Sequence, residues 1–344
     1  MSAACDPPRT VAVFGGQDLV GDAFLKLPFL RAMRAAWPSA HITWLVSGQS
    51  AFASSMASVG APYLDRVVER CGLGSGRWAE LVRPVPRGLG PYDLLLDSQA
   101  RPMLSVSLWR VPHQRFVAAA LATRGAGQHL VDRLLALVGA AHGQAVRWDL
   151  SPVAVPEALR AAAAAALPDA GASDAARRYV AIAPGAGGVH KCWPMEHFAA
   201  LARILAERGL VPAVLLGPAE ADARASFQAA APAAIFPEEH PAFAASPGGS
   251  QPLRVVAIAE RCALGVANDA GPGHMIAAAG TPLVSLFGPT PPAKFRPLMP
   301  RASRVLRAQD FGGTAAMGAI PVAAVAEAVS DLLAEPASGA PWPR

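Results

Sequence analysis

The chain has 344 residues, which is enough for two domains, each with its own hydrophobic core. Its formal charge is +5 and 53% of its residues are hydrophobic, yet no uninterrupted apolar run reaches the roughly 18 residues of a membrane-spanning helix. Asp6 and two prolines precede the first apolar run, which argues against a signal peptide and makes the cytosol the expected compartment.

Most of the positive charge is arginine, because only three of the thirty basic residues are lysines. The planar guanidinium group binds phosphates and carboxylates through paired hydrogen bonds. No dense basic run carries interleaved aromatic residues, so nucleic acid is not an expected partner. We expect an anionic small substrate or an anionic lipid surface instead. The four cysteines have the spacing of neither a zinc site nor a redox pair, which indicates reduced thiols.

Short apolar segments alternate with amphipathic segments along the chain, which predicts strands alternating with helices. The predicted strands, two of them running into glycine-rich turns, are residues 10–16, 41–47, 92–99, 179–188, 211–218, 263–269 and 282–289. The predicted helices are residues 23–38, 129–141, 195–209, 253–262 and 273–280. This alternation is typical of α/β proteins with doubly wound parallel sheets that helices cover on both faces.

The pattern of strand, glycine turn and helix begins near Val11 and begins again near Tyr179, which predicts two Rossmann-like domains facing a central cleft. We assign residues 1–170 to the N-terminal domain and residues 171–335 to the C-terminal domain, with a linker within residues 167–178. The last helix is a candidate for packing back on the N-terminal domain. Residues 238–252 are predicted to form a surface loop near the site, and residues 335–344 a frayed tail.

The stretch APGAGGVHKCWP (residues 183–194) has the features of a phosphate-binding turn. A strand ends there, and Gly185, Ala186 and Gly187 follow it before Lys191. Glycines let a ligand approach the backbone, and free N–H groups at a helix start attract anions. The alternative is an ordinary strand-to-helix turn with a solvated lysine.

The stretch VANDAGPGHMIAAAG (residues 266–280) provides a second helix start of this kind. Asp269 follows an apolar strand and is a candidate cap for the next helix, while Gly271 and Gly273 expose backbone donors and His274 falls in the first turn. The alternative is a capped helix with a satisfied histidine. Two anion-binding helix starts in one domain favour a diphosphate ligand.

The stretch FGGQDLVGDAFLKLP (residues 14–28) places Asp18 and Asp22 at the first helix start of the chain. An acid at that position is ordinary capping in most proteins. The functional alternative is that Asp22 acts as a general base toward a hydroxyl group.

Three stretches in chain order resemble glycosyltransferase family 9, the heptosyltransferases of lipopolysaccharide core assembly. They are GDAFLKLPFLRAMRAAWPSAHITWLV, PGAGGVHKCWPMEHFAALARIL and NDAGPGHMIAAAGTPLVSLFGPTPPAKFRP. The resemblance covers roughly residues 11 to 298. It implies a GT-B fold with an N-terminal acceptor-binding domain and a C-terminal domain for the nucleotide sugar. It further implies inverting transfer from a nucleotide sugar, typically ADP-heptose, with neither cofactor nor metal.

The resemblance also implies roles for single residues. Asp22 would be the catalytic base and Lys191 would bind the donor phosphates. Glu220 stands where the family often binds the ribose hydroxyls, as a carboxylate that accepts two hydrogen bonds. The diphosphate and the sugar end of the donor would be held by residues of two turns, namely Gly185, Ala186, Gly187, Asp269, Ala270, Gly271 and His274.

Two departures from the family pattern concern the acceptor and the donor sugar. Ala186 and Gly187 replace hydroxyl residues, so the backbone alone would bind phosphate there. The first turn lacks the usual basic and serine residues, and Asp18 adds a negative charge.

The acceptor implied by the resemblance is a lipid-linked core oligosaccharide, which would make the protein peripheral to the cytoplasmic face of the inner membrane. Arg101, Arg110, Arg115 and Arg124 follow a predicted strand end and either bind an acidic acceptor or form a solvated face. Two other functions fit the same fold. One is a nucleotide-sugar epimerase, and the other is a non-catalytic paralogue that binds a nucleotide sugar.

Overall fold

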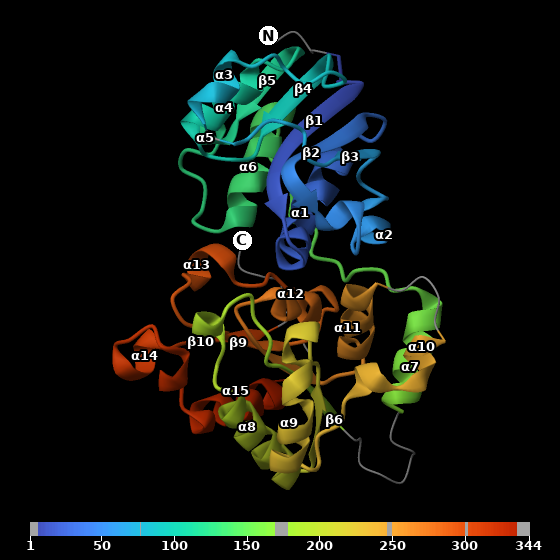
Figure 1. Cartoon of the computed structure of the whole chain (residues 1–344), viewed down its shortest axis with the longest axis vertical. Helices are drawn as coiled ribbons and strands as arrows, with labels where there is room; N and C mark the ends of the chain where they lie inside the picture. The colour runs from blue at the N-terminus through green and yellow to red at the C-terminus, as the bar shows by residue number, and fades with distance from the viewer. Residues whose placement is uncertain (1–5, 76, 169–177, 246–249, 300–301, 336–344) are drawn as a thin grey trace. The chain divides into compact units, whose positions relative to one another are not determined.

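The computed structural model describes residues 6–75, 77–168, 178–245, 250–299 and 302–335. The chain divides into two compact units, Met1–Asp149 and Leu150–Arg344, each built on one five-stranded sheet (Figure 1). This boundary lies ahead of the one expected at residue 170. The reason is that the alanine-rich helix α7 (Glu157–Ala166) packs against α10 (Pro241–Ala244) and α11 (Gln251–Ala259) of the second unit. Residues 169–177 of the predicted linker lie outside the described residues.

The N-terminal unit has a parallel sheet with the strand order β3-β2-β1-β4-β5. Its strands are β1 (Thr10–Asp18), β2 (His41–Ser50), β3 (Arg66–Val68), β4 (Tyr92–Asp97) and β5 (His113–Ala118). Its helices are α1 (Val20–Ala36), α2 (Ala57–Gly60), α3 (Trp78–Val82), α4 (Pro102–Trp109), α5 (Ala119–Ala122), α6 (Leu130–His142) and the 3₁₀ turn η1 (Ala51–Ala53). The central strand β1 is buried from Val11 to Phe14, as a strand covered on both faces must be.

The C-terminal unit repeats this plan with the order β10-β9-β8-β6-β7. Its strands are β6 (Arg178–Ala183), β7 (Leu210–Val214), β8 (Leu264–Asn268), β9 (Leu283–Phe287) and β10 (Ser303–Arg307). Besides α7, α10 and α11, its helices are α8 (Met195–Glu207), α9 (Arg224–Ala230), α12 (Gly271–Ala278), α13 (Pro292–Phe295), α14 (Gln309–Gly312) and α15 (Val322–Ala334). Its 3₁₀ turns are η2 (Val189–Lys191), η3 (Pro218–Ala223), η4 (Pro237–Glu239) and η5 (Met317–Ala319).

The last helix, α15, packs against α8 and against strands of its own sheet, which differs from the predicted packing on the N-terminal domain. Val325 and Val329 are fully buried in this contact, beside Leu201 and Leu205 of α8. Within the described ranges, no helix combines the length and the apolar character needed to cross a membrane.

Each sheet has one point where the direction of winding reverses. In the N-terminal sheet the chain moves outward from β1 to β3 and then returns to place β4 on the other side of β1. In the C-terminal sheet the same reversal falls between β6 and β8. All strand pairs are parallel, so the carboxyl ends of β6 and β8 lie side by side at one edge of the sheet. Open α/β sheets bind ligands at such switch points.

Much of the predicted surface loop 238–252 is helical, and residues 246–249 of it lie outside the described ranges. Phe243 of α10 is buried, with its ring near the guanidinium group of Arg254. Glu238 of η4 lies in the same part of the unit. Burial raises the pKa of its carboxyl group to about 7, and the charge of Arg254 offsets only part of this rise. The folded chain therefore holds the Glu238 proton more tightly than the unfolded chain does.

The pKa of Glu238 predicts a pH dependence of stability. The contribution of the protonated side chain is complete below an unfolded-state pKa of 4.5 and is lost as the pH rises through about 7. We expect Glu238→Gln, which cannot ionise, to become progressively more stable than the unsubstituted chain between about pH 5 and about pH 8. Urea unfolding across this range measures the difference, and parallel stability profiles would contradict the assignment.

Candidate active site

The carboxyl ends of β6 and β8 are joined by the side chain of Asn268, which is 1% exposed. Its amide nitrogen donates to the carbonyl oxygen of Pro184 at 2.7 Å, and its amide oxygen accepts from the backbone N–H of Trp193 at 3.0 Å. One amide thus fixes both ends of the glycine-rich turn predicted at residues 183–194. The sequence placed Asn268 at a strand end but did not identify it as a positioning residue.

Lys191 and Asp269 meet at this switch point. The Lys191 ammonium lies 3.1 Å from Oδ2 of Asp269, and the exposed fractions of the two side chains are 31% and 7%. The prediction that Asp269 caps α12 is wrong, because Ala270 is the N-cap residue and α12 has no side-chain cap hydrogen bond. The carboxylate binds the lysine instead.

The start of α12 adjoins this ion pair. Gly271 is its first residue, and the first N–H groups of any helix have no partner within the helix. His274 lies in the first turn and is buried. Lys191 after β6 and the residues Asp269, Ala270, Gly271 and His274 after β8 therefore follow the adjacent carboxyl ends of these two strands.

The carboxylate of Glu220, a residue of η3, lies close to the turn that follows β6. A Cβ atom on Gly185 would lie 2.8 Å from its carboxylate, and one on Gly217 would lie 2.7 Å away. The absence of a side chain at both positions leaves room for this rotamer of Glu220. The pKa of Cys192 is raised by burial and further raised by the negative charge of Glu220, which places that charge near η2. Around Gly187, by contrast, a Cβ atom would meet nothing within 4 Å.

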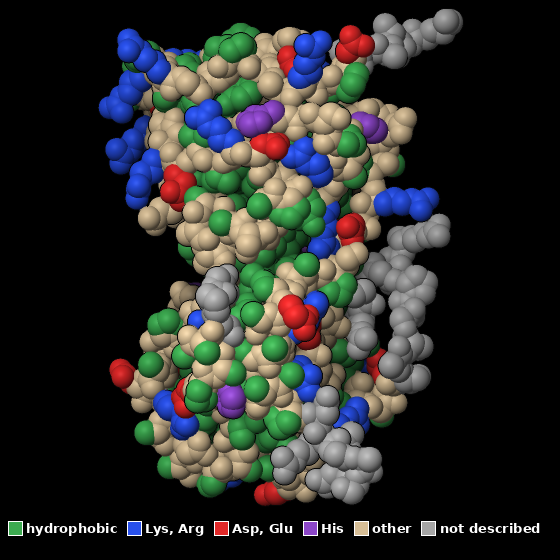
Figure 2. Space-filling model, turned by 90° about the vertical axis from the view of Figure 1, so that its right-hand side faces the viewer, with side chains coloured by type: hydrophobic (Ala, Val, Ile, Leu, Met, Phe, Trp, Pro, Cys, Tyr) green, Lys and Arg blue, Asp and Glu red, His purple; other side chains and the backbone are tan. Residues whose placement is uncertain are grey.

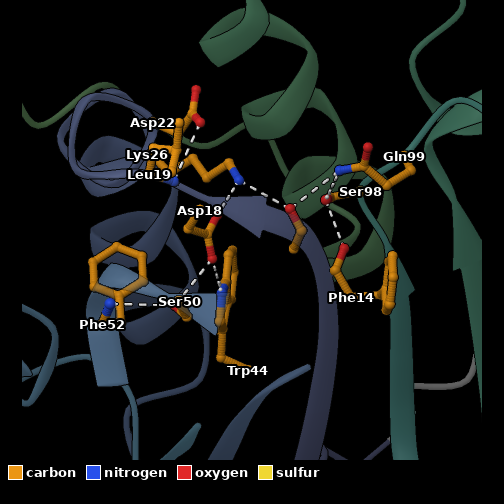
Figure 3. Close-up of polar contacts among 11 residues, drawn as sticks. Phe14, Asp18, Leu19, Asp22, Lys26, Trp44, Ser50, Phe52, Ser98 and Gln99 are labelled. Atoms are coloured by element: carbon orange, nitrogen blue, oxygen red, sulfur yellow. Dashed lines mark hydrogen bonds and ion pairs between the residues drawn. The ribbon is translucent and has the colours of Figure 1, made fainter. Parts of the chain in front are cut away.

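In the N-terminal unit, the switch point holds a buried ion pair, drawn in Figure 3. Asp18 ends β1 and is 3% exposed. Its carboxylate pairs with Lys26 of α1 and accepts hydrogen bonds from Trp44 Nε1 at 2.6 Å and Ser50 Oγ at 3.2 Å. Lys26 also donates to the carbonyl oxygen of Gly15 at 2.9 Å. The sequence placed Asp18 at the helix start and counted it as an added negative charge, and the structure corrects both points. Asp18 is the last residue of β1, and Lys26 neutralises its charge.

Asp22 is the third residue of α1 and is half-buried. One of its carboxylate oxygens lies 3.4 Å from the backbone nitrogen of Leu19, the N-cap residue, so Asp22 completes the first turn of the helix (Figure 3). Lys26 follows it by one helical turn, and the ion pair with Asp18 therefore anchors the turn that carries Asp22.

The predicted acceptor arginines lie apart from one another. Arg101 is exposed and directly precedes α4, close to the carboxyl end of β4. Arg110 is bound at the other end of α4, where it donates to the carbonyl oxygens of Glu80 and Arg83. Arg115 donates to the carbonyl oxygen of Ala141 and lines a cavity of about 460 Å³ together with Asp6 to Pro8 and His142. Only Arg101 of these three lies directly beyond a strand end.

Among the residues that the structure describes, no group of three or more His, Cys, Asp or Glu side chains could hold a metal ion. Cys71, Cys192 and Cys262 are free thiols, in agreement with the sequence, while Cys5 lies outside the described residues.

The two doubly wound units are those of the GT-B fold. A family 9 glycosyltransferase from Veillonella parvula has a TM-score of 0.69 at 20% identity, with 97% of this chain and 99% of that chain covered. The E. coli ADP-heptose lipopolysaccharide heptosyltransferase II has a TM-score of 0.63 at 21% identity, with 94% and 98% covered. These similarities show the fold.

The family follows from the sequence match. The model of glycosyltransferase family 9 (heptosyltransferase) matches residues 112–312, more than half of the chain, so the protein belongs to this family. Lipooligosaccharide heptosyltransferase 2 of Haemophilus influenzae is 32% identical over 129 residues, which are 37% of this chain and 36% of that protein. Lipopolysaccharide heptosyltransferase 2 of E. coli is 35% identical over 132 residues, or 38% and 36%. The aligned segments span about a third of these curated relatives.

The buried pair of Asp18 and Lys26 makes a stability prediction. We expect Lys26→Met to lower the free energy of unfolding by about 3–5 kcal/mol, because it leaves the Asp18 carboxylate buried without its countercharge. Urea denaturation measures the loss. The control is the double variant Asp18→Asn with Lys26→Met, which removes both charges and should regain most of the stability. A double variant as unstable as the single one would contradict the ion-pair explanation.

Proposed function

We propose that this protein is an inverting glycosyltransferase that moves a sugar from a nucleotide-sugar donor, ADP-heptose, to an oligosaccharide acceptor of the lipopolysaccharide core. The observation that carries the proposal is the group formed by Lys191, Gly187 and the start of α12 at the switch point of the C-terminal sheet. Membership of the heptosyltransferase family supports it. So do the structures of an E. coli heptosyltransferase of the same fold, which was solved with ADP and with ADP-2-deoxy-2-fluoro heptose.

In this proposal the donor occupies the C-terminal unit. Lys191 and the N–H groups of Gly187 and Gly271 receive the diphosphate, whose negative charge grows as the bond to the sugar breaks. Asp269 holds the ammonium group of Lys191 in place and faces the sugar end of the donor together with His274. Glu220 accepts hydrogen bonds from the ribose hydroxyls.

The chemical step needs one base. The acceptor oxygen forms a bond to the anomeric carbon while the bond from that carbon to the diphosphate breaks, so the configuration inverts and ADP leaves. The acceptor proton passes to the carboxylate of Asp22, which stands half-exposed at the start of α1. Since a lysine and backbone N–H groups stabilise the negative charge of the diphosphate in this proposal, we expect the reaction to need no metal ion.

Calorimetric titration with ADP, UDP and GDP in the presence of EDTA tests the donor site. We expect ADP to bind most tightly and Lys191→Met to weaken that binding at least about tenfold, because a charge-assisted phosphate contact is lost. Arg203→Met, which removes an exposed positive charge elsewhere on the C-terminal unit, is the matched control. A preference for UDP or GDP would discard the heptose donor, and no binding of any of the three would support a non-catalytic role.

Substitution of Asp22 tests the base. We expect Asp22→Asn to lower turnover by about 10²–10⁴-fold, because amide nitrogen cannot take the proton, and to leave ADP affinity unchanged. The readout is release of ADP with acceptor oligosaccharide. Asp331→Asn on the exposed face of α15 is the control. Turnover by Asp22→Asn equal to that of the control would remove Asp22 from the mechanism.

A further inference from the structure

Four large apolar side chains of the N-terminal unit are exposed on two adjacent helices. On α3, Trp78 is 74% and Val82 is 86% exposed, and on α4, Val106 is 53% and Trp109 is 62% exposed. We refer to these four residues as the α3–α4 patch. Monomeric proteins rarely leave two tryptophans open to water in one place, because exposed aromatic surface is costly.

The spacing along each helix places the two exposed residues of that helix on one face. Trp78 and Val82 are four residues apart, and Val106 and Trp109 are three apart, so each pair shares one helix face. Leu104 and Leu108 of α4 are buried, and they are the residues by which this helix contacts the core. The exposed pairs therefore belong to the outer faces of helices whose inner faces are already packed.

A buried carboxylate fixes α3 against α4. Glu80 of α3 accepts hydrogen bonds from the backbone N–H of Gly74 at 2.7 Å and from the hydroxyl group of Ser107 on α4. Arg110, at the end of α4, donates to the carbonyl oxygen of Glu80 at 2.7 Å. These bonds hold the two short helices together, so the exposed pairs of α3 and α4 are carried by neighbouring helices in a fixed arrangement.

The chain around the patch is strongly basic. Residues 70–124 contain eight arginines, no lysine and only three acids, namely Glu80, Asp93 and Asp97. Glu80 and Asp97 are buried, and the carboxylate of Asp93 accepts from the backbone N–H groups of Arg9 and Thr10. Arg77 and Arg83 adjoin the apolar residues of α3 and are exposed. Figure 2 faces the side opposite to the one on which Figure 1 labels α3 and α4, and basic side chains gather there along one edge of the N-terminal unit.

We propose that the α3–α4 patch docks the N-terminal unit onto the surface of an anionic lipid bilayer. Tryptophan favours the boundary between headgroups and acyl chains, and arginine can extend past an apolar surface to reach lipid phosphates. A second copy of the same surface would bring like charges together, which disfavours self-association through the patch. The inference uses none of the residues assigned to sugar transfer, so its test is independent of the test of the proposed function.

Flotation of the full chain with lipid vesicles tests the proposal. We expect binding to vesicles that contain phosphatidylglycerol, weak binding to pure phosphatidylcholine, and release by salt. The variant Trp78→Ser with Trp109→Ser should bind at least about tenfold less tightly, because two interfacial anchors are lost. Arg77→Gln with Arg83→Gln should reduce binding to the anionic vesicles alone, by about tenfold.

Two controls separate docking from damage to the fold. Phe311→Ser removes a 40% exposed apolar side chain from α14 of the other unit and should leave vesicle binding unchanged. The patch variants should keep the ADP affinity and the unfolding transition of the unsubstituted chain. The proposal would be overturned if the variant without both tryptophans bound vesicles as tightly as the unsubstituted chain, or if the unsubstituted chain did not bind anionic vesicles. So would a dimer that the tryptophan substitutions convert to a monomer.

Discussion

The amide side chain of Asn268 holds together the two strand ends between which the C-terminal sheet reverses its winding. It donates to Pro184 after β6 and accepts from Trp193 before α8, with almost no exposure to water. A buried amide of this kind is costly unless both of its ends are bonded, so it selects one path for the turn between them. The positions of Gly187 and Lys191, which lie on that turn, depend on this selection.

In the N-terminal sheet, an ion pair rather than an amide fixes the backbone at the switch point. Asp18 and Lys26 form a buried ion pair at its switch point, and Trp44 and Ser50 satisfy the remaining acceptor sites of the carboxylate. A buried ion pair adds little net stability over an apolar contact, but removal of one partner strongly lowers the free energy of unfolding. The pair therefore acts mainly as a constraint. It ties the end of β1 to α1 and leaves the first turn of that helix, with Asp22, in one orientation.

The sequence predicted what depends on local chemistry. Glycine, lysine and histidine after buried strands indicated the turns at Gly185 and Gly271, and alternating apolar segments indicated the parallel sheets. It did not predict the two hydrogen-bond donors of the Asp18 carboxylate. Trp44 and Ser50 come from another strand and reach the carboxylate only after the sheet has formed. The domain boundary differed because an alanine-rich helix such as α7 carries no local signal for the sheet that it will cover.

The pairing of Lys191 with Asp269 restricts how a diphosphate could be received. A buried carboxylate next to phosphate is unfavourable unless a cation stays between them. An ammonium group has three donors, so Lys191 can keep one on Asp269 and turn the others toward phosphate oxygens. Arginine would be drawn into a two-bond pairing with the carboxylate and would lose that freedom. A lysine at this position is therefore a side chain that Asp269 can orient and that can still bind the diphosphate of the proposed donor.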